Sequence, residues 1–493
     1  MNLLIFDVGT SSMRGTLFDK NAQILIEAKH RYQPIFHSKE CVTQDSFLWK
    51  RALFEIAKEV ANWCRENNQE IEGISLTSQR SSIIPVDYNG VPLCDAIMWQ
   101  DKRNRKVCEH LKSMNKEIIQ RSGTSINPIF SGSKMTWLRR ERPDIYKRAY
   151  KLPVVADYLL FQMTGQWKSD KTYGSRSHLM NLRKGEWDTT LMEIFQVDEK
   201  KLCQLIEPGE LHGKITDKFA KKTGIKEGTP VYSAGGDQQC AALGMGIFQE
   251  GSIEVTSGTG AFIIGLIKKL PDVFEGNLVL NYSACKNQYI VESSILTCCA
   301  AFDWFCMNFY GVDAAGDYQK VNEEIAKSPP GANGCILLPF FQGRAAPTWN
   351  PEATASFANV TLSTSRGDMA RAVLEGIAYE IRNSMDVIEG ITGAAKQIYI
   401  GGGLSQSTEF NKIQADVYGR KLIYYSNAEA TSLGAWISTS VQLKNFCSYE
   451  EAFTQARKKD EIIFYDPQKE YMETYQKYRR EMNHLYQKMY ITE

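Results

Sequence analysis

The sequence lacks both long apolar runs and an excess of charge of one sign. No stretch reaches the ~18–20 consecutive apolar residues that a membrane-spanning helix needs. The opening MNLLIFDVGTSS has only a short apolar run before Asp7 and no basic segment ahead of it, so we expect no signal peptide. The 58 basic residues nearly balance the 57 acidic ones, for a formal net charge of +1. We therefore expect neither a membrane nor a nucleic acid as partner.

Patterned cysteines and histidines are also missing. The 12 cysteines include the adjacent pair Cys298 and Cys299 but no C-x-x-C, and the six histidines form no H-E-x-x-H. These absences argue against a structural zinc site and against a disulfide framework. Reduced thiols are typical of the cytoplasm, so we expect a soluble, cytoplasmic protein.

Apolar periodicity near the N-terminus changes from strand to helix and back. Segments 3–7, 13–19 and 24–30 are apolar runs separated by turn residues, which is the pattern of β-strands. From Asp45 onward, apolar residues recur every three or four positions, as on one face of a helix, and segment 71–79 again resembles a strand. This alternation predicts an α/β fold with a largely parallel sheet.

The second half of the chain begins as the first half does. Residues 251–267 repeat the strand, glycine turn and strand of residues 2–18. A chain of 493 residues is also longer than the ~250–300 residues of a single core. We therefore predict a duplicated architecture of two domains, 1–246 and 247–493, with a central cleft between them.

A helical stripe of large side chains lies near the C-terminus. Its members are spaced by three and four residues and are Tyr471, Tyr475, Tyr478, Met482, Leu485 and Met489. Two interpretations are open: the stripe binds a partner, or it packs on the core of its own protein.

Segment DVGTSSMR has the residues of an anion-binding turn. Gly9 permits a tight hairpin in which the N–H groups of Thr10, Ser11 and Ser12 converge on an anion. Asp7 precedes the turn, where its carboxylate could hold a hydrated Mg²⁺. The alternative is an ordinary D-x-G hairpin with a capping aspartate. We count Gly9, Thr10, Ser11 and Arg14 as candidate nucleotide-binding residues.

Segment TSGTG is a second turn of this kind, in which Gly258, Thr259 and Gly260 would approach phosphate oxygens. Alone it is an ordinary Gly/Ser/Thr turn, but two such turns from two domains can clamp a triphosphate. A Walker motif is absent, and the later GGG triplet lacks the G-x-G-x-x-G spacing of dinucleotide sites. We interpret Gly402 and Gly403 as approaching the nucleoside or α-phosphate at a helix N-terminus.

Segment SAGGDQQ places a single carboxylate, Asp237, directly after two glycines. Glycines at this point allow a sharp turn or a close approach to another group. The small apolar residues that follow suit a closely packed helix. An aspartate that only caps this helix is the simplest alternative to a functional carboxylate.

Nine segments of the chain resemble those of the FGGY carbohydrate kinases and occur in the same order over roughly residues 1–445. They are DVGTSSMRG, SQRSS, AIMWQDKR, FSGSKMTWL, GGDQ, SGTGAF, GRAAPTWNP, LEGIAYEIRNSM and GGGLSQS. The resemblance implies a two-domain actin-like (ribonuclease H-like) ATPase fold. It also implies transfer of the γ-phosphoryl group of ATP to a polyol or ketose with Mg²⁺, and a dimer or tetramer. Asn359 stands where a glycine is frequent in the family.

The resemblance assigns roles to the acceptor site. It makes Asp237 the general base for the attacking sugar hydroxyl and a second candidate Mg²⁺ ligand, with Gln238 binding another hydroxyl. Arg80 would donate to sugar oxygens, Trp99 would stack on an apolar sugar face, and Asp101 would accept from a hydroxyl. A core position for Trp99 and an ion pair of Asp101 with Lys102 or Arg103 are the alternatives.

The predicted acceptor depends on two departures from the glycerol-kinase branch. Ser81 stands where that branch has a glutamate, and Ile129 where it has a tyrosine. The loss of a carboxylate and a phenol removes two hydroxyl partners and leaves a roomier, less acidic site. We therefore expect a ketose of the xylulose class, with Ser81 among the substrate-binding residues. An autoinducer-2-type sugar and glycerol are the alternatives within the family.

Two other classes of function share some of these features. An actin-like ATPase such as a chaperone motor has paired phosphate turns but no GGDQ carboxylate at a polyol pocket. The second half-fold also leaves no length for a peptide-binding domain. A non-catalytic sugar sensor has no need of Asp7, Asp237 and both glycine turns. The sequence therefore favours an ATP-dependent sugar kinase.

Overall fold

The computed structural model describes residues 1–312, 318–345, 348–427 and 429–491, which form two compact units. Unit 1 consists of Met1–Phe248, Ile267–Ile290 and Glu429–Lys459, and unit 2 of Gln249–Leu266, Val291–Ala428 and Asp460–Glu493. The predicted division at 246/247 differs from this one. Segments 267–290 and 429–459 follow it in the chain but pack within unit 1.

The core of unit 1 is a six-stranded sheet. Its order is β12 (Leu211–Lys214), β13 (Pro230–Gly236), β6 (Gly73–Ser78), β1 (Leu3–Val8), β2 (Ser12–Phe18) and β3 (Ile24–Arg31). β6 pairs in parallel with both β1 and β13, and the remaining pairs are antiparallel. The predicted strand, turn and strand at the N-terminus is confirmed, but the predicted largely parallel sheet is wrong for this unit, because three of its five strand pairs are antiparallel.

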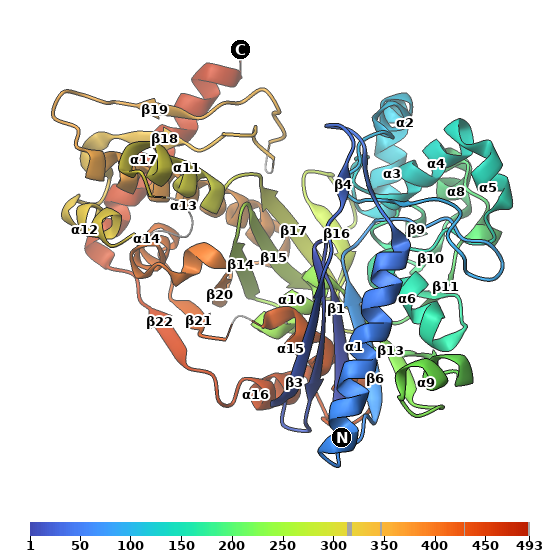
Figure 1. Cartoon of the computed structure of the whole chain (residues 1–493). Coiled ribbons are helices and arrows are strands. Elements are labelled where there is room, and N and C mark those ends of the chain that lie inside the picture. Colours follow the sequence, from blue (N-terminus) through green and yellow to red (C-terminus); the bar gives the residue numbers. More distant parts are fainter. Residues whose placement is uncertain (313–317, 346–347, 428, 492–493) are drawn as a thin grey trace. The chain divides into compact units, whose positions relative to one another are not determined.

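Helix α1 (Ser46–Glu66) packs on β2 and β3 (Figure 1). The carboxylate of Asp45 caps it by accepting from the N–H of Phe47 at 2.9 Å, which satisfies one N-terminal donor. The helix buries the predicted apolar stripe, including Trp49 and Ile56. A Cβ at Gly15 would lie 2.3 Å from the Ile56 side chain, so the glycine in β2 lets the helix approach the sheet.

Helices α10 (Asp237–Met245) and α15 (Ala430–Gln442) pack backbone against backbone in unit 1. A Cβ at Gly244 would lie 1.9 Å from the carbonyl oxygen of Ala430, and one at Gly434 would lie 1.7 Å from that of Cys240. The closely packed helix expected after Asp237 is thus confirmed. Its partner is the segment that returns to unit 1 from beyond the predicted division.

Most of the other elements of unit 1 come between β6 and β13 in the chain. They contain a second buried cluster that includes Met135, Leu138 and Phe195. They are β4 (Ile35–Phe36), β5 (Val42–Gln44), β7 (Ala96–Ile97), α2 (Arg105–His110), α3 (Asn115–Ser122), α4 (Ser131–Glu141), α5 (Pro143–Arg148), α6 (Val155–Thr164), β8 (Lys168–Asp170), α7 (Lys171–Gly174), β9 (Met180–Asn181), β10 (Glu186–Trp187), α8 (Thr189–Phe195), β11 (Gln204–Ile206), α9 (Asp217–Thr223), β16 (Val279–Tyr282) and α16 (Tyr449–Ala456). This region supplies most of the candidate acceptor site.

The sheet of unit 2 repeats the plan of unit 1. Its order is β17 (Tyr289–Ile295), β15 (Ala261–Ile267), β14 (Ser252–Ser257), β20 (Gln397–Gly401), β21 (Leu422–Tyr425) and β22 (Ile462–Tyr465). β14 forms an antiparallel hairpin with β15 and pairs in parallel with β20, as β1 does with β2 and β6. The predicted duplication is confirmed at the level of strand order.

Helices cover the sheet of unit 2, and the C-terminal helix is one of them. The other elements are α11 (Cys299–Tyr310), α12 (Gln319–Lys327), β18 (Ile336–Leu338), β19 (Ser356–Ala358), α13 (Arg366–Thr392), α14 (Thr408–Tyr418) and α17 (Lys469–Tyr490). Tyr475 and Met482 are fully buried within unit 2, and the Tyr475 hydroxyl accepts from Arg371 at 2.6 Å. The C-terminal stripe therefore packs on its own unit through these residues.

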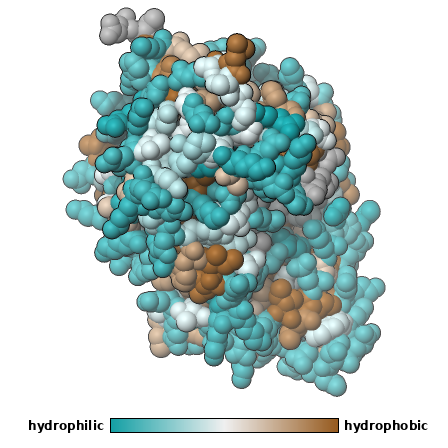
Figure 2. Space-filling view, turned by 90° about the vertical axis from the view of Figure 1, so that its left-hand side faces the viewer, coloured by the Kyte–Doolittle hydropathy of each residue, from teal (hydrophilic) through white to brown (hydrophobic). Residues whose placement is uncertain are grey.

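Two surface features bear on the earlier expectations. No helix within the described residues combines the length and apolar character needed to cross a membrane. The face that Figure 2 shows is mostly hydrophilic, with small separate apolar areas.

Asn359, which replaces a frequent glycine, has a φ of 57°, a left-handed conformation that asparagine adopts more readily than most residues.

Candidate active site

The turn between β1 and β2 presents open backbone donors. The N–H of Gly9 donates to the carbonyl oxygen of Ser12 at 2.9 Å, and the hydroxyl of Tyr32 donates to the Gly9 carbonyl at 2.9 Å. Within the part of the chain that the structure describes, the N–H groups of Thr10 and Ser11 have no acceptor. The turn can therefore offer both groups to an anion.

Charged side chains surround this turn. Asp7 lies opposite Arg14 in the β1–β2 pairing, with 4.0 Å between Oδ2 of Asp7 and Nη2 of Arg14. Nη1 of Arg14 donates to Oε1 of Glu429 at 2.6 Å, so much of its charge is already compensated. Burial, together with repulsion by Asp237, raises the pKa of Asp7 to about 7 although Arg14 lowers it. The local field thus favours binding of a cation.

Asp237 is the first residue of α10 and directly follows the glycines that end β13. Gly235 has a φ of 119°, a conformation that side chains disfavour, and lies next to an irregularity in the pairing of β13 with β6. A Cβ at Gly236 would lie 2.7 Å from Cδ of Arg80. The glycines therefore let the strand turn into the helix while Arg80 lies against the backbone.

Arg80 holds the Asp237 carboxylate in position. Its Nε lies 3.3 Å from Oδ1 of Asp237, and its Nη1 donates to Oε1 of Gln239 at 3.3 Å. The Arg80 side chain is 8% exposed and that of Asp237 is 27% exposed, so the carboxylate remains accessible. Gln238 is also partly exposed, and its N–H donates to Oδ1 of Asp237 at 2.8 Å. The structure brings Arg80, Asp237 and Gln238 together as the sequence predicts.

Gln239 is a member of this cluster that sequence reasoning missed. Its side chain is buried and accepts from Arg80, so it orients the guanidinium that faces Asp237. The doubled glutamine of GGDQQ was the available signal. Gln239 lies two residues after Asp237, the first residue of α10, so its amide is close to that carboxylate. The sequence could therefore have indicated a contact of Gln239 with Arg80, the arginine predicted for the same site.

Trp99 connects the acceptor region to the first turn. Its Nε1 donates to the hydroxyl of Thr10 at 3.1 Å, and its backbone N–H donates to that of Ser82 at 2.9 Å. The side chain is partly buried. Trp99 is therefore not simply a core residue, because its Nε1 bonds the β1–β2 turn that carries the open N–H groups.

Asp101 forms the ion pair that the sequence left as an alternative. Its side chain is fully buried, with Oδ1 2.8 Å from Nε of Arg103 and Oδ2 2.7 Å from Nη2. Oδ2 also accepts from the N–H of Val42 at 2.6 Å. A direct contact of Asp101 with the acceptor stays a prediction, and in this conformation both oxygens are engaged within the protein.

Ser81 and Ile129 provide little polarity of their own. Ser81 is buried with a φ of 70°, and its hydroxyl donates to the carbonyl of Arg176 at 3.2 Å. The carbonyl oxygen of Ile129 accepts from Nζ of Lys134 at 2.7 Å, and burial lowers the pKa of that fully buried lysine to about 7. Lys134 is a further residue that the sequence reasoning passed over, although it lies in the FSGSK motif.

The turn between β14 and β15 is held by main-chain bonds. The N–H of Gly258 donates to Gly260 O at 2.8 Å, and the N–H groups of Cys298 and Cys299 donate to Thr259 O at 2.7 Å and Gly258 O at 2.9 Å. Among the described residues, the N–H groups of Thr259 and Gly260 lack acceptors. The main-chain N–H groups of the adjacent cysteines therefore shape this second turn, and its binding of an anion stays a prediction.

The GGG triplet packs against this second turn. Gly402 has a φ of 90°, and a Cβ there would lie 2.5 Å from the carbonyl oxygen of Ser257. Gly403 begins a short 3₁₀ turn, and a Cβ there would lie 3.8 Å from Sγ of Cys299. Close approach to the β14 backbone is one reason for these glycines, and their contact with a nucleotide stays a prediction.

The described ranges contain no group of three or more His, Cys, Asp and Glu side chains placed to hold a metal ion. The described side chains therefore do not form a metal site in which every ligand comes from the protein. Mg²⁺ commonly binds through one or two carboxylates, with water and phosphate oxygens completing its octahedron. Asp7 and Asp237, whose charges repel each other, fit that mode.

Comparisons with known proteins place the geometry in a wider context. Models of the N- and C-terminal domains of the FGGY family of carbohydrate kinases match residues 2–244 and 253–443. A glycerol kinase from Thermococcus onnurineus is 30% identical over 442 residues, covering 88% of this chain and 87% of that protein.

Solved structures are similar over the whole chain. A ligand-bound xylulose kinase from Lactobacillus acidophilus has a TM-score of 0.91 at 21% identity, and a Plasmodium falciparum glycerol kinase with ADP has a TM-score of 0.91 at 24% identity. Each match covers 100% of this chain and 99% of the other. They confirm the two-domain actin-like, ribonuclease H-like fold.

Proposed function

The chain belongs to the FGGY family of carbohydrate kinases, phosphotransferases with an alcohol group as acceptor, and on that premise we propose that it phosphorylates a small ketose with ATP. The observation that carries the proposal is the partly exposed carboxylate of Asp237 at the start of α10, held by Arg80 at 3.3 Å. A carboxylate presented in this way can reach an acceptor hydroxyl that binds beside it.

Asp237 acts as the general base. It takes the proton of the attacking hydroxyl as that oxygen bonds to the γ-phosphorus of ATP and the bond from this phosphorus to the leaving ADP breaks. A base must lie within hydrogen-bond reach of that proton. Arg80 pairs with the carboxylate and the N–H of Gln238 donates to it, so both groups orient it. The Gln238 amide and the Arg80 guanidinium hold further acceptor oxygens, while Trp99 offers its ring face.

The two glycine turns hold the phosphates of ATP. Thr10 and Ser11 in unit 1, and Thr259 and Gly260 in unit 2, each supply open backbone N–H groups, which bind phosphate oxygens without reorganisation. Gly9, Gly258, Gly402 and Gly403 keep the backbone free of side chains there. Arg14 belongs to this set as a charge beside the first turn.

Asp7 and Asp237 are the two carboxylates that would hold Mg²⁺. When bound, the ion neutralises charge on the transferring phosphoryl group. The residues fit it because the two carboxylates repel each other and the nearest cation, Arg14, is already paired with Glu429. Binding of a cation relieves that repulsion.

A ketose of the xylulose class suits the acceptor site. Ile129 provides no side-chain hydrogen bond, and the hydroxyl of Ser81 is bonded to the Arg176 carbonyl. A small triol would therefore lose a carboxylate partner at one position and a phenol partner at the other, at about 1–3 kcal/mol for each lost hydrogen bond. A longer polyhydroxy chain can instead place its carbons beside Ser81 and Ile129 and form its hydrogen bonds with other residues of the acceptor site.

Glycerol is the second candidate. It is favoured by the 30% identity to the glycerol kinase from Thermococcus onnurineus over most of both chains.

ADP release measured with a panel of D- and L-ketoses, polyols, gluconate and glycerol tests the proposal. We expect the highest kcat/KM with a terminal hydroxyl of a five-carbon ketose. The double variant Ser81→Glu with Ile129→Tyr should move the ratio of ketose to glycerol activity toward glycerol. Highest kcat/KM with glycerol in the unaltered protein would disprove the ketose assignment, and no ADP release above that of Asp237→Asn with any acceptor would disprove the kinase.

A further inference from the structure

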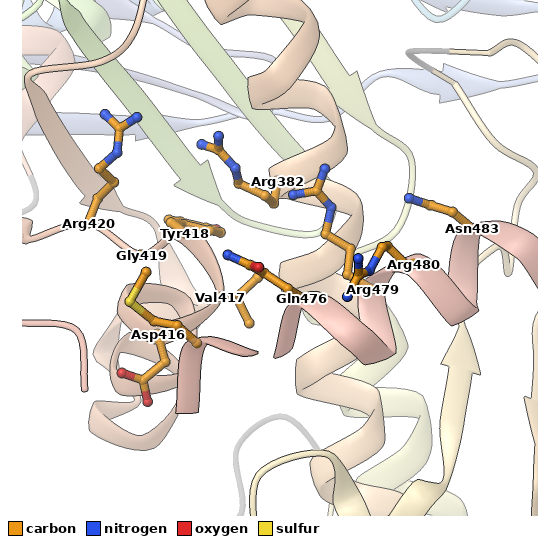
Figure 3. A pocket seen from close by; sticks show the side chains of 11 residues that line it. Arg382, Asp416, Val417, Tyr418, Gly419, Arg420, Gln476, Arg479, Arg480 and Asn483 are labelled. Carbon is orange, nitrogen blue, oxygen red and sulfur yellow. The ribbon is translucent and has the colours of Figure 1, made fainter. Parts of the chain in front are cut away.

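A cavity of about 400 Å³ lies within unit 2, lined by residues of α13, α14 and α17 (Figure 3). Four arginines line it: Arg382 from α13, Arg420 from the turn after α14, and Arg479 and Arg480 from α17. Tyr418, at the end of α14, lies among them in Figure 3. Arginines from three helical regions thus surround one space.

This cavity is separate from the phosphate turn of the same unit. β20 and β21 are parallel, and Gly401 ends β20 whereas Arg420 precedes the start of β21. The GGG triplet therefore lies at the C-terminal ends of these parallel strands, and the cavity lies at their N-terminal ends. Helix α14 spans the distance with 11 residues, roughly 16 Å at 1.5 Å per residue.

Carboxylates compensate the arginines only in part. Nη2 of Arg382 lies 2.7 Å from Asp386 and 2.8 Å from Glu389. The same two carboxylates also serve Arg479, which pairs with Asp386, and Arg420, which is 3.6 Å from Glu389. Three guanidinium groups thus share two carboxylates.

The remaining charges leave the cavity positive. Arg480 is exposed and forms no ion pair with any residue that the structure describes. Asp416 also lines the cavity, but its Oδ1 accepts from the N–H of Gln468 at 2.7 Å. In Figure 3 its carboxylate points away from Arg382 and Arg420. It therefore does not neutralise them directly.

Arg382 also has an unsatisfied donor. Its Nη1 is buried and has no hydrogen-bond acceptor among the described residues, and the Arg382 side chain as a whole is 13% exposed. Buried donors without acceptors are uncommon because the lost hydration is not replaced. An oxygen of a bound anion in the cavity would satisfy this group.

We propose that the cavity binds the phosphate group of a small phosphorylated molecule. A phosphate dianion has the charge to engage several arginines at once, and the planar guanidinium matches its oxygens. The volume lies in the range of about 300–1,000 Å³ that is usual for small-ligand pockets. The amide of Gln476, which is exposed and also lines the cavity, is available to the rest of the ligand.

Calorimetric titration of the full chain, without ATP or acceptor, tests this inference. The ligands are inorganic phosphate, a hexose phosphate and AMP, and the variants are Arg382→Gln and Arg480→Gln. Lys488→Gln is the matched control, because Lys488 is an exposed cation of α17 outside the cavity. We expect a phosphate ester to bind the unaltered chain, and at least about tenfold weaker binding in each arginine variant but not in the control.

Arg480 is exposed, so its replacement should leave folding intact, and a thermal melt of each variant checks this. Equal affinities in the unaltered chain and Arg480→Gln, or no binding of any of the three ligands at millimolar concentrations, would overturn the proposal. Equal affinity for inorganic phosphate and the esters would overturn the assignment of an organic carrier. These readouts do not use phosphoryl transfer, so they stand or fail independently of the proposed kinase activity.

Discussion

The two glycine turns share one backbone plan but differ in charge. Asp7 lies two residues before Gly9 and faces Arg14 across its hairpin, whereas Thr256 lies two residues before Gly258 and faces Phe262. Each hairpin pairs in parallel with a following strand and leaves open N–H groups at its turn. Both turns keep open N–H groups, while the charged pair of Asp7 and Arg14 in unit 1 is replaced by Thr256 and Phe262 in unit 2.

The turns also differ in how they are supported. Side chains bond the first turn, since Tyr32 donates to the Gly9 carbonyl and Trp99 to the Thr10 hydroxyl. Main-chain N–H groups of Cys298 and Cys299 bond the second. The first turn therefore depends on side chains that a substitution can remove, whereas the second depends on main-chain groups that a substitution leaves in place.

The largest effect should follow from removing the base in unit 1. Asp237→Asn should lower kcat by roughly 10²–10⁴-fold, because general-base assistance is lost while the shape of the side chain is kept. Steady-state kinetics with ATP and the best acceptor measure it. Asp217→Asn, on the exposed side of α9, is the control and should change nothing. More than about a tenth of the activity remaining would remove Asp237 from this role.

Replacing Asp7 by the residue of the other turn tests the charge difference directly. Asp7→Thr should lower kcat/KM by about 10²-fold and raise the Mg²⁺ concentration needed for half-maximal rate, since one of two carboxylates is gone. The melting temperature should not fall, because a buried carboxylate repelled by Asp237 is removed. Glu27→Gln, which alters another carboxylate near Arg14, is the control. An unchanged Mg²⁺ requirement would contradict the assignment.

A side chain at the second turn should affect ATP alone. A Cβ at Gly258 would meet only Gly260 O at 3.7 Å, so Gly258→Val should fold normally. It should still crowd bound phosphates and raise KM for ATP about tenfold, the equivalent of 1.4 kcal/mol, with KM for the acceptor unchanged.

Gly260→Val makes the contrast, because its Cβ would lie 2.4 Å from the carbonyl oxygen of Ile295. That variant should lose thermal stability. If Gly258→Val raised only the KM for the acceptor, the second turn would not be a phosphate site.

The smallest effect should come from the supports of the turns. Trp99→Phe removes the bond to Thr10, a neutral interaction of about 0.5–1.5 kcal/mol, so KM for ATP should rise roughly two- to tenfold. Cys299→Ser keeps the main-chain N–H that bonds Gly258 and should change KM by less than about twofold. Equal effects of the two changes would show that side chains support both turns alike.

Local patterns in the sequence were sufficient for the regular elements. The helix expected from Asp45 begins at Ser46 with Asp45 as its cap, and the strands expected at 3–7 and 24–30 are β1 and β3. Both glycine hairpins are where the repeated pattern placed them. Periodicity and capping act over a few residues, so one sequence reports them well.

Contacts distant in sequence were beyond that reasoning. Nothing near residue 434 indicates that its glycine will lie against Cys240, yet this contact brings 429–459 into unit 1. The partner of Asp101 illustrates the same limit, because the sequence left Lys102 and Arg103 open, and only the packing shows that Arg103 pairs with this buried carboxylate.

The sequence by itself determined the α/β class, the duplicated hairpins and the position of a lone carboxylate after two glycines. Only the tertiary structure decided which groups meet that carboxylate: Arg80 lies 157 positions away in the chain but 3.3 Å from it in space. The physical reason is that hydrogen-bonded turns and apolar faces are local properties of the backbone. Charge pairing and burial depend instead on how whole elements pack, which no short segment of the sequence encodes.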